Sequence, residues 1–233
     1  MFSLKSSILL PILTVALLGA AVEPARAALV SMPSTGVDDT GARLALGAAD
    51  PHWRVVAGPG ITAPATAWVA PNQHPLGQYF ERPDSAWIWV DSESAAGVVG
   101  EPYTLELIID LTSYNPATIS LSGFWGADNY GRILLNGASA IGSGELELVG
   151  VNTDHFNFGH AFTINGGFVP GINRLSFEIT DDSNPGGLNV YGLVIDAVSV
   201  PEPGSLAIFS TALGLMGLAR RRSVGRAELP QTA

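Results

Sequence analysis

The chain has 233 residues, of which 47% are hydrophobic, and a formal net charge of −10 at pH 7. Residues 28–199 contain eighteen acidic residues and five arginines, a net charge of −13, so this region repels phosphate backbones and we expect no nucleic-acid partner. The chain has no cysteine and this region has no lysine, which excludes thiol nucleophiles, disulfides, Cys-ligated zinc and Schiff-base chemistry.

The N-terminus contains the parts of a secretory signal peptide in order. Lys5 precedes an apolar run at residues 8–21, and the small residues Ala25 and Ala27 stand at −3 and −1 before Ala28. This order predicts export through the Sec machinery and cleavage after Ala27, with an uncleaved membrane anchor as the alternative. In both cases the middle of the chain is exported.

Residues 28–50 are rich in glycine, aspartate and alanine and show no hydrophobic periodicity, so we expect a loose arm there. From residue 51 onward, short hydrophobic runs are separated by glycine, proline and asparagine, a pattern typical of short strands joined by turns. The runs predict strands at residues 53–56, 66–69, 87–90, 103–111, 119–125, 132–135, 161–164, 173–180 and 189–200.

Two local patterns indicate the class of fold. Leu175, Phe177 and Ile179 alternate with polar residues, which places them on one face of a strand. The pair Asn136-Gly137 has the residue types of a tight hairpin turn. The sequence shows no convincing amphipathic helix between the two ends. We therefore predict an all-β fold, an antiparallel β-sandwich of the jelly-roll type or a barrel, flanked by an N-terminal signal helix and a C-terminal transmembrane helix.

Two motifs in the second half of this region resemble those of a known fold. An aspartate-led loop precedes a strand ending in Asn-Gly at residues 128–137, and a Gly-x-Asn-x-Leu turn opens a late strand at residues 171–175. Over residues 105–198 the chain is similar to galactose-binding-like jelly-roll modules. The resemblance implies a sandwich that serves either as a sugar binder or as a bare spacer.

Two loops carry candidate ligand-binding residues. Asp128 and Asn129 either hydrogen-bond their own backbone in a turn or contact a ligand or cation. Asp181, Asp182 and Asn184 place several oxygen donors in one loop, as a calcium site requires. They lack the spacing of an EF-hand loop, so a solvated turn is the favoured interpretation. We expect no cofactor unless calcium binds there.

Aromatic residues and histidines carry a second set of alternatives. Trp87 and Trp89 are two residues apart on a predicted strand, so both rings share one face. That face is either a sugar-stacking platform or, as is commoner in small sandwiches, part of the core. His155 and His160 do not have the spacing of zinc ligands, and we expect them in a surface loop.

An enzyme is the least favoured class. Glycoside hydrolysis needs two carboxyl groups across a cleft, and Glu101 with Glu106 or Glu145 with Glu147 could be such a pair. Nothing in the sequence selects one pair among so many acids. No nucleophile elbow or phosphate-binding loop is present in the sequence. We therefore expect a protein that is not an enzyme.

The C-terminal tail has three parts. A Pro-Glu-Pro motif is followed by an uncharged apolar run at residues 205–219 and then by three arginines. As a helix, the run would be about 22 Å long, a short membrane span whose arginines stay on the cytoplasmic side. A buried core helix is the alternative. The residues of the motif and of the basic cluster are Pro201, Glu202, Pro203, Arg220, Arg221 and Arg222.

This tail resembles the PEP-CTERM sorting signal of Gram-negative bacteria. In that family a membrane-embedded exosortase recognises and processes the tail, and the family is associated with exopolysaccharide and with biofilm or floc formation. The resemblance implies a protein that crosses the inner membrane of a Gram-negative bacterium. It is anchored there before processing and then reaches the cell surface or the extracellular space.

These observations predict an exported, exosortase-processed surface or matrix protein with a non-catalytic β-sandwich. A carbohydrate-binding module, with or without calcium, is the alternative, and a glycoside hydrolase ranks below both. The expected partners are the Sec machinery, exosortase and extracellular polysaccharide. The expected organisation is a signal peptide at 1–27, an arm at 28–50, a β-sandwich at 51–199, a sorting segment at 200–222 and a cytoplasmic tail at 223–233.

Overall fold

A computed structural model describes residues 27–70, 79–92, 97–150, 155–182 and 185–200, together with 212, 214 and 216. Residues 25–200 form one compact unit that contains all the strands and their core, so this unit has what a domain needs to fold alone. The expected signal peptide lies outside the described residues except for Ala27. Of the expected transmembrane segment, only residues 212, 214 and 216 are described, each in a helical conformation.

Among the described residues there is no helix that is both long enough and apolar enough to cross a membrane.

The described unit is all-β, apart from one short 3₁₀ turn, η1, at Pro116–Thr118. Nine strands overlap the nine predicted runs: β2 (Ala49–Ala57), β3 (Ala65–Val69), β4 (Ile88–Trp89), β5 (Pro102–Asp110), β6 (Ser120–Asp128), β7 (Tyr130–Leu135), β11 (His160–Gly166), β12 (Ile172–Thr180) and β13 (Gly187–Val198). Four more strands have no counterpart among the predictions: β1 (Ala27–Ser31), β8 (Ala138–Ser139), β9 (Ile141–Gly144) and β10 (Glu147–Leu148).

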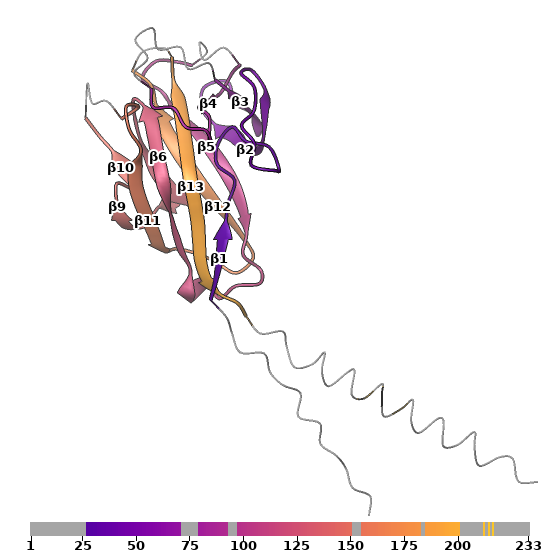
Figure 1. The fold of residues 1–233 in the computed structure, drawn as a ribbon. Coiled ribbons are helices and arrows are strands. Elements are labelled where there is room, and N and C mark those ends of the chain that lie inside the picture. The colour runs from indigo at the N-terminus through magenta and orange to yellow at the C-terminus, as the bar shows by residue number, and fades with distance from the viewer. Residues whose placement is uncertain are drawn as a thin grey trace, which may run out of the picture. The chain divides into compact units, whose positions relative to one another are not determined.

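The predicted all-β antiparallel fold is confirmed, and its strands form one 13-stranded sheet. Its order is β10-β7-β12-β5-β2-β3-β4-β13-β6-β11-β9, with β1 added to β13 and β8 added to β7. The chain from β8 to β10 joins the two ends of the sheet, because β8 and β10 pair with β7 while β9 pairs with β11. The sheet is therefore nearly closed and barrel-like (Figure 1). The alternation of inward and outward residues is the same in a sandwich and in a barrel, so it cannot separate the two.

The core lies inside this curved sheet and is built from large aromatic residues. Phe177 on β12 packs against Trp53 of β2, Trp125 of β6 and Phe162 of β11, with ring centroids 5.7, 5.3 and 6.0 Å apart. All four side chains are almost completely buried. One ring thus contacts three other strands of the sheet, which holds the barrel together by apolar burial.

The two predicted turn motifs are confirmed. Asn136 and Gly137 have φ angles of 54° and 80° and join β7 to β8 as a two-residue hairpin. Gly171 has a φ angle of 82°, and the Asn173 amide donates to the carbonyl oxygens of Val169 and Gly171 at 2.8 and 3.0 Å. Leu175 follows them into the core.

Within residues 28–50, where we expect a loose arm, the structure has β1 and several tertiary hydrogen bonds. The backbone N–H of Thr35 donates to the Val190 carbonyl oxygen at 2.9 Å. The carboxylate of Asp50 accepts the backbone N–H of Gly36 at 2.7 Å. These bonds hold the segment on β13 and at the start of β2.

The chain enters and leaves the barrel at the same end. Ala27 of β1 pairs with Val198 of β13, so the predicted cleavage bond between Ala27 and Ala28 lies at the exposed start of β1. β13 begins at the opposite end of the barrel with Gly187, which pairs with Asp128 of β6. β13 has 12 residues, so its first and last residues lie roughly 35 Å apart at about 3.3 Å per residue.

Candidate functional site

The two predicted ligand loops meet at the end of the barrel opposite the paired residues Ala27 and Val198. Asp128 ends β6, while Asp181 and Asp182 directly follow β12. The backbone N–H of Asp182 donates to the Asn129 side-chain oxygen at 2.7 Å, and the Asn129 N–H donates to the Thr180 carbonyl oxygen at 3.1 Å. The structure therefore brings together residues that the sequence placed in two separate sites. Asn184, the third predicted calcium ligand, lies outside the described residues.

Asp128 is a buried carboxyl group of this cluster with a raised pKa. Its side chain is buried and accepts a hydrogen bond from the Tyr79 hydroxyl, which also contacts the Pro185 carbonyl oxygen at 2.9 Å. Burial raises the pKa of Asp128 to about 7; the Tyr79 bond opposes this rise, and the nearby carboxylates of Asp181 and Asp182 add to it. Burial and the Asp128 charge together raise the pKa of the Tyr79 hydroxyl. Asp128 can thus hold a proton close to neutral pH.

The acidic cluster has an internal hydrogen-bond network rather than an evident metal geometry. The Tyr130 hydroxyl donates to Asp182 at 3.1 Å, and the Gly100 N–H donates to the Asp181 carbonyl oxygen at 2.8 Å. Across the part of the chain that the structure describes, no three His, Asp or Glu side chains are grouped as a metal ion requires. Calcium binding at this loop stays a prediction.

Trp87 and Trp89, the predicted sugar-stacking pair, are both core side chains in the structure. Trp87 is 1% exposed and Trp89 is 0% exposed. The Trp87 indole N–H donates to the Phe80 carbonyl oxygen at 3.0 Å, and the Trp89 ring packs edge-on against Tyr103. Neither ring presents a face to a ligand.

An aromatic surface that sequence reasoning missed lies on β6 and β13. Phe124 is 41% exposed, and its ring is stacked on that of Tyr191, with centroids 5.2 Å apart and an interplanar angle of 9°. The guanidinium of Arg82 lies 4.0 Å from the Tyr191 ring centroid, and Asp84 holds it through hydrogen bonds of 2.7 and 2.9 Å. The sequence could have predicted an exposed Phe124, because this residue has the outward position in the alternating run at 119–125.

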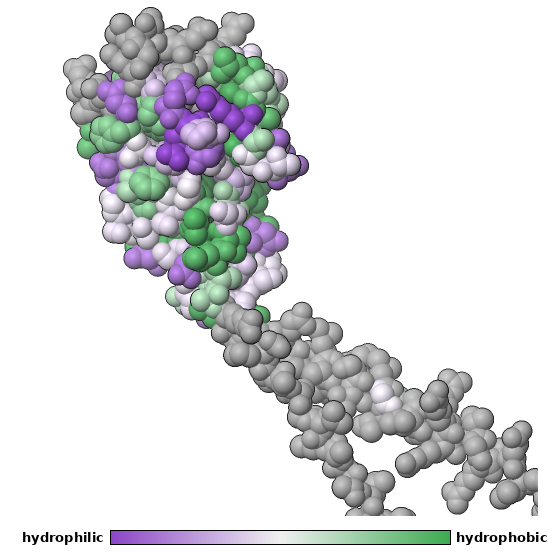
Figure 2. Space-filling view, in the orientation of Figure 1, coloured by the Kyte–Doolittle hydropathy of each residue, from purple (hydrophilic) through white to green (hydrophobic). Residues whose placement is uncertain are grey.

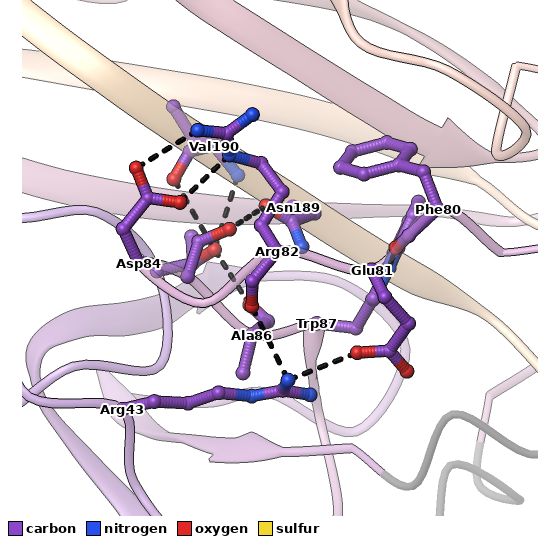
Figure 3. Close-up of polar contacts among 11 residues, drawn as sticks. Arg43, Phe80, Glu81, Arg82, Asp84, Ala86, Trp87, Asn189 and Val190 are labelled. Atoms are coloured by element: carbon purple, nitrogen blue, oxygen red, sulfur yellow. Dashed lines mark hydrogen bonds and ion pairs between the residues drawn. The ribbon is translucent and has the colours of Figure 1, made fainter.

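One ion pair, Arg82 with Asp84, lies beside the Tyr191 ring of this aromatic stack. Figure 2 shows hydrophilic side chains gathered over the upper end of β13 and a hydrophobic patch lower down, beside β1. Figure 3 shows the ion pairs of the segment at residues 80–87: Arg82 is paired with Asp84 within it, and Glu81 is paired with Arg43 at 2.9 Å. The Ser85 hydroxyl of the same segment donates to the Asn189 side-chain oxygen at 2.8 Å. The arginine beside the stack is therefore held in place.

Of the two histidines predicted in a surface loop, His155 lies in a turn before β11, whereas His160 lies buried on β11. Its Nδ1 is 2.8 Å from the Glu145 carboxylate, and its Nε2 is 3.4 Å from Nδ1 of His155. His155 Nε2 is in turn 3.3 Å from the Val149 carbonyl oxygen. These contacts link a carboxylate and two imidazoles in one row of polar side chains. Glu145, which we considered as a catalytic acid paired with Glu147, thus has His160 as its partner.

Comparison with known proteins gives one finding. The PEP-CTERM protein-sorting motif matches residues 199–223. Neither the search of curated proteins nor the search of solved structures found a match, so the galactose-binding-like resemblance has no support from a relative. The predicted sorting motif is therefore confirmed, and it indicates an exported protein that exosortase targets to the surface.

Proposed function

We propose that this chain is an exported surface or extracellular-matrix protein with a non-catalytic, barrel-like domain that associates with exopolysaccharide. The observation that carries the proposal is the position of the sorting motif. The motif begins at residue 199, directly after β13 ends at Val198. The barrel is therefore the part of the molecule that exosortase processing delivers.

The surroundings of two candidate catalytic acids, Glu106 and Glu145, and of the buried Asp128 support a non-catalytic domain. Glu106 accepts a hydrogen bond from Arg174 at 2.5 Å and another from the Ser176 hydroxyl at 3.3 Å. Glu145 is bound to His160. Asp128 has the pKa of a general acid, but its carboxyl group is buried under Tyr79. Each of these acids thus has a partner within the fold that would compete with a substrate.

The exposed aromatic stack supports association with a sugar polymer and favours a carbohydrate-binding module as the second candidate function. Sugar rings stack on flat aromatic faces through their C–H groups, and Phe124 is 41% exposed. The arginine over Tyr191 adds a hydrogen-bond donor beside it. This surface differs from the tryptophan pair that the sequence suggested.

The proposal is tested by co-sedimentation of purified residues 28–200 with the exopolysaccharide of the host, followed by assay of reducing ends. We expect the domain to sediment with the polymer and to release no reducing ends. Phe124→Ala tests the aromatic surface, with Phe158→Ala, another exposed phenylalanine, as the matched control. A domain that stays in the supernatant, or one that cleaves the polymer, would contradict the proposal.

A further inference from the structure

We propose that a groove on the outer face of the barrel binds a carboxylated sugar unit, that is, a uronic acid residue within an extracellular polysaccharide. The groove has a volume of about 770 Å³ and lies between residues 31–41 and the strands β2 and β5. Small-ligand sites have volumes of roughly 300–1,000 Å³, so the groove has room for a sugar. The inference deepens the proposed function and rests on it for the source of the sugar.

The walls of the groove are held in place by hydrogen bonds. The buried carboxylate of Asp50 accepts the backbone N–H groups of Gly36 at 2.7 Å and of His52 at 2.8 Å, which ties residues 31–41 to β2. Asp38 accepts the backbone N–H and the hydroxyl of Thr40 at 2.8 and 2.7 Å. A preformed groove loses little conformational entropy when a ligand binds.

Four acidic residues line the groove: Asp38 and Asp39 have no arginine partner among the described residues, whereas the other two are paired with arginines. Glu106 on β5 is paired with Arg174, and Asp84 is paired with Arg82. These carboxylates are therefore poor partners for a cation. They also repel an incoming carboxylate less than free acids would, because each pair carries no net charge.

Arg54 is the group that selects a carboxylate. It lies exposed on β2, lines the groove and makes no ion pair with any residue that the structure describes. The other arginines of residues 28–199 each have a carboxylate partner: Arg43 with Glu81, Arg82 with Asp84, Arg132 with Glu178 and Arg174 with Glu106. A guanidinium binds a carboxylate through two parallel hydrogen bonds, and here that capacity is unused.

The remaining polar groups of the groove suit the hydroxyl groups of a sugar. Thr40, His52 and Asp39 line the same space and can donate to or accept from ring hydroxyls; His52 Nε2 is 3.6 Å from Asp39 Oδ1. The net charge of −13 over residues 28–199 disfavours a dense polyanion. The fitting ligand is thus an otherwise neutral chain with an isolated uronic acid.

The test is calorimetric titration of residues 28–200 with a short oligosaccharide that contains one galacturonic acid residue. Its methyl ester, which lacks the charge and adds one methyl group, is titrated in parallel. Arg54→Gln removes the charge, and Arg132→Gln is the matched control on another part of the sheet. Circular dichroism and thermal melting establish that both variants fold.

We expect the acid to bind, and Arg54→Gln to weaken its binding roughly tenfold or more, the effect of losing a charged bidentate contact. Arg132→Gln should bind the acid as tightly as the wild type does. The wild type should bind the methyl ester as weakly as Arg54→Gln binds the acid. Equal binding of acid and ester, equal binding by Arg54→Gln, or no binding to the wild type overturns the groove assignment. If the domain still sediments with the host polymer in any of these cases, the proposed function stands without the groove.

Discussion

Asp128→Asn should make the stability of the barrel less dependent on pH. The pKa of Asp128 is raised to about 7 in the folded protein, from 3.8 for an ordinary aspartate, chiefly by burial. Folding therefore favours the protonated carboxyl group. The contribution of this group to stability is fully present below pH 3.8 and is lost as the pH rises toward 7. A difference of roughly three pH units corresponds to at most about 4 kcal/mol.

Asparagine has the shape of a protonated aspartate and can still accept the Tyr79 hydroxyl. The variant should thus match the wild type near pH 4 and be more stable at pH 7.5, by up to about 4 kcal/mol, or on the order of 10 °C in Tm. Urea unfolding of both proteins at several pH values measures the difference. A stability difference that does not change between pH 4 and 7.5 would refute the assignment of a raised pKa to Asp128.

Two further predictions concern the core and the closure of the sheet. Phe177→Ala should lower the free energy of unfolding by about 3–5 kcal/mol, because it empties the centre of the aromatic core. Phe158 is 56% exposed, so Phe158→Ala should lower the free energy of unfolding by less than about 1 kcal/mol. Equal losses in urea unfolding would contradict this account of the core. Gly142→Ala should loosen the pairing of β9 with β11, because a Cβ at this position would overlap with the carbonyl oxygen of Thr163. Faster amide hydrogen exchange in β9 and β11, with β12 and β5 unchanged, is the expected result, and unchanged exchange in β11 would show that this contact does not close the sheet.

The sequence predicted the long strands because their apolar alternation is strong. Leu175, Phe177 and Ile179 face the core as expected, and Asn136-Gly137 forms the expected turn. The short strands that join the two ends of the sheet were missed. Residues 141–144 are exposed throughout and show no alternation, and it is their pairing with β11 that makes the sheet barrel-like.

The candidate site was predicted only in pieces, for two physical reasons. Asp128 and Asp181 were each singled out, but their meeting depends on how β6, β12 and β13 pair, which local patterns do not encode. Trp87 and Trp89 were assigned a shared face by period two. That rule assumes one exposed face, whereas residues 86–89 are all buried, so the pattern says nothing about exposure there.

The central claim is that the tail sorts the barrel to the surface, and fractionation of cells tests it most directly. The full chain is compared with a variant in which Pro201, Glu202 and Pro203 are replaced by alanine, and mass spectrometry measures the mature protein in each fraction. We expect the wild type in the surface or matrix fraction, shortened at its C-terminus, and the variant at the inner membrane with its tail intact. The same mass and the same distribution for both proteins would contradict the account.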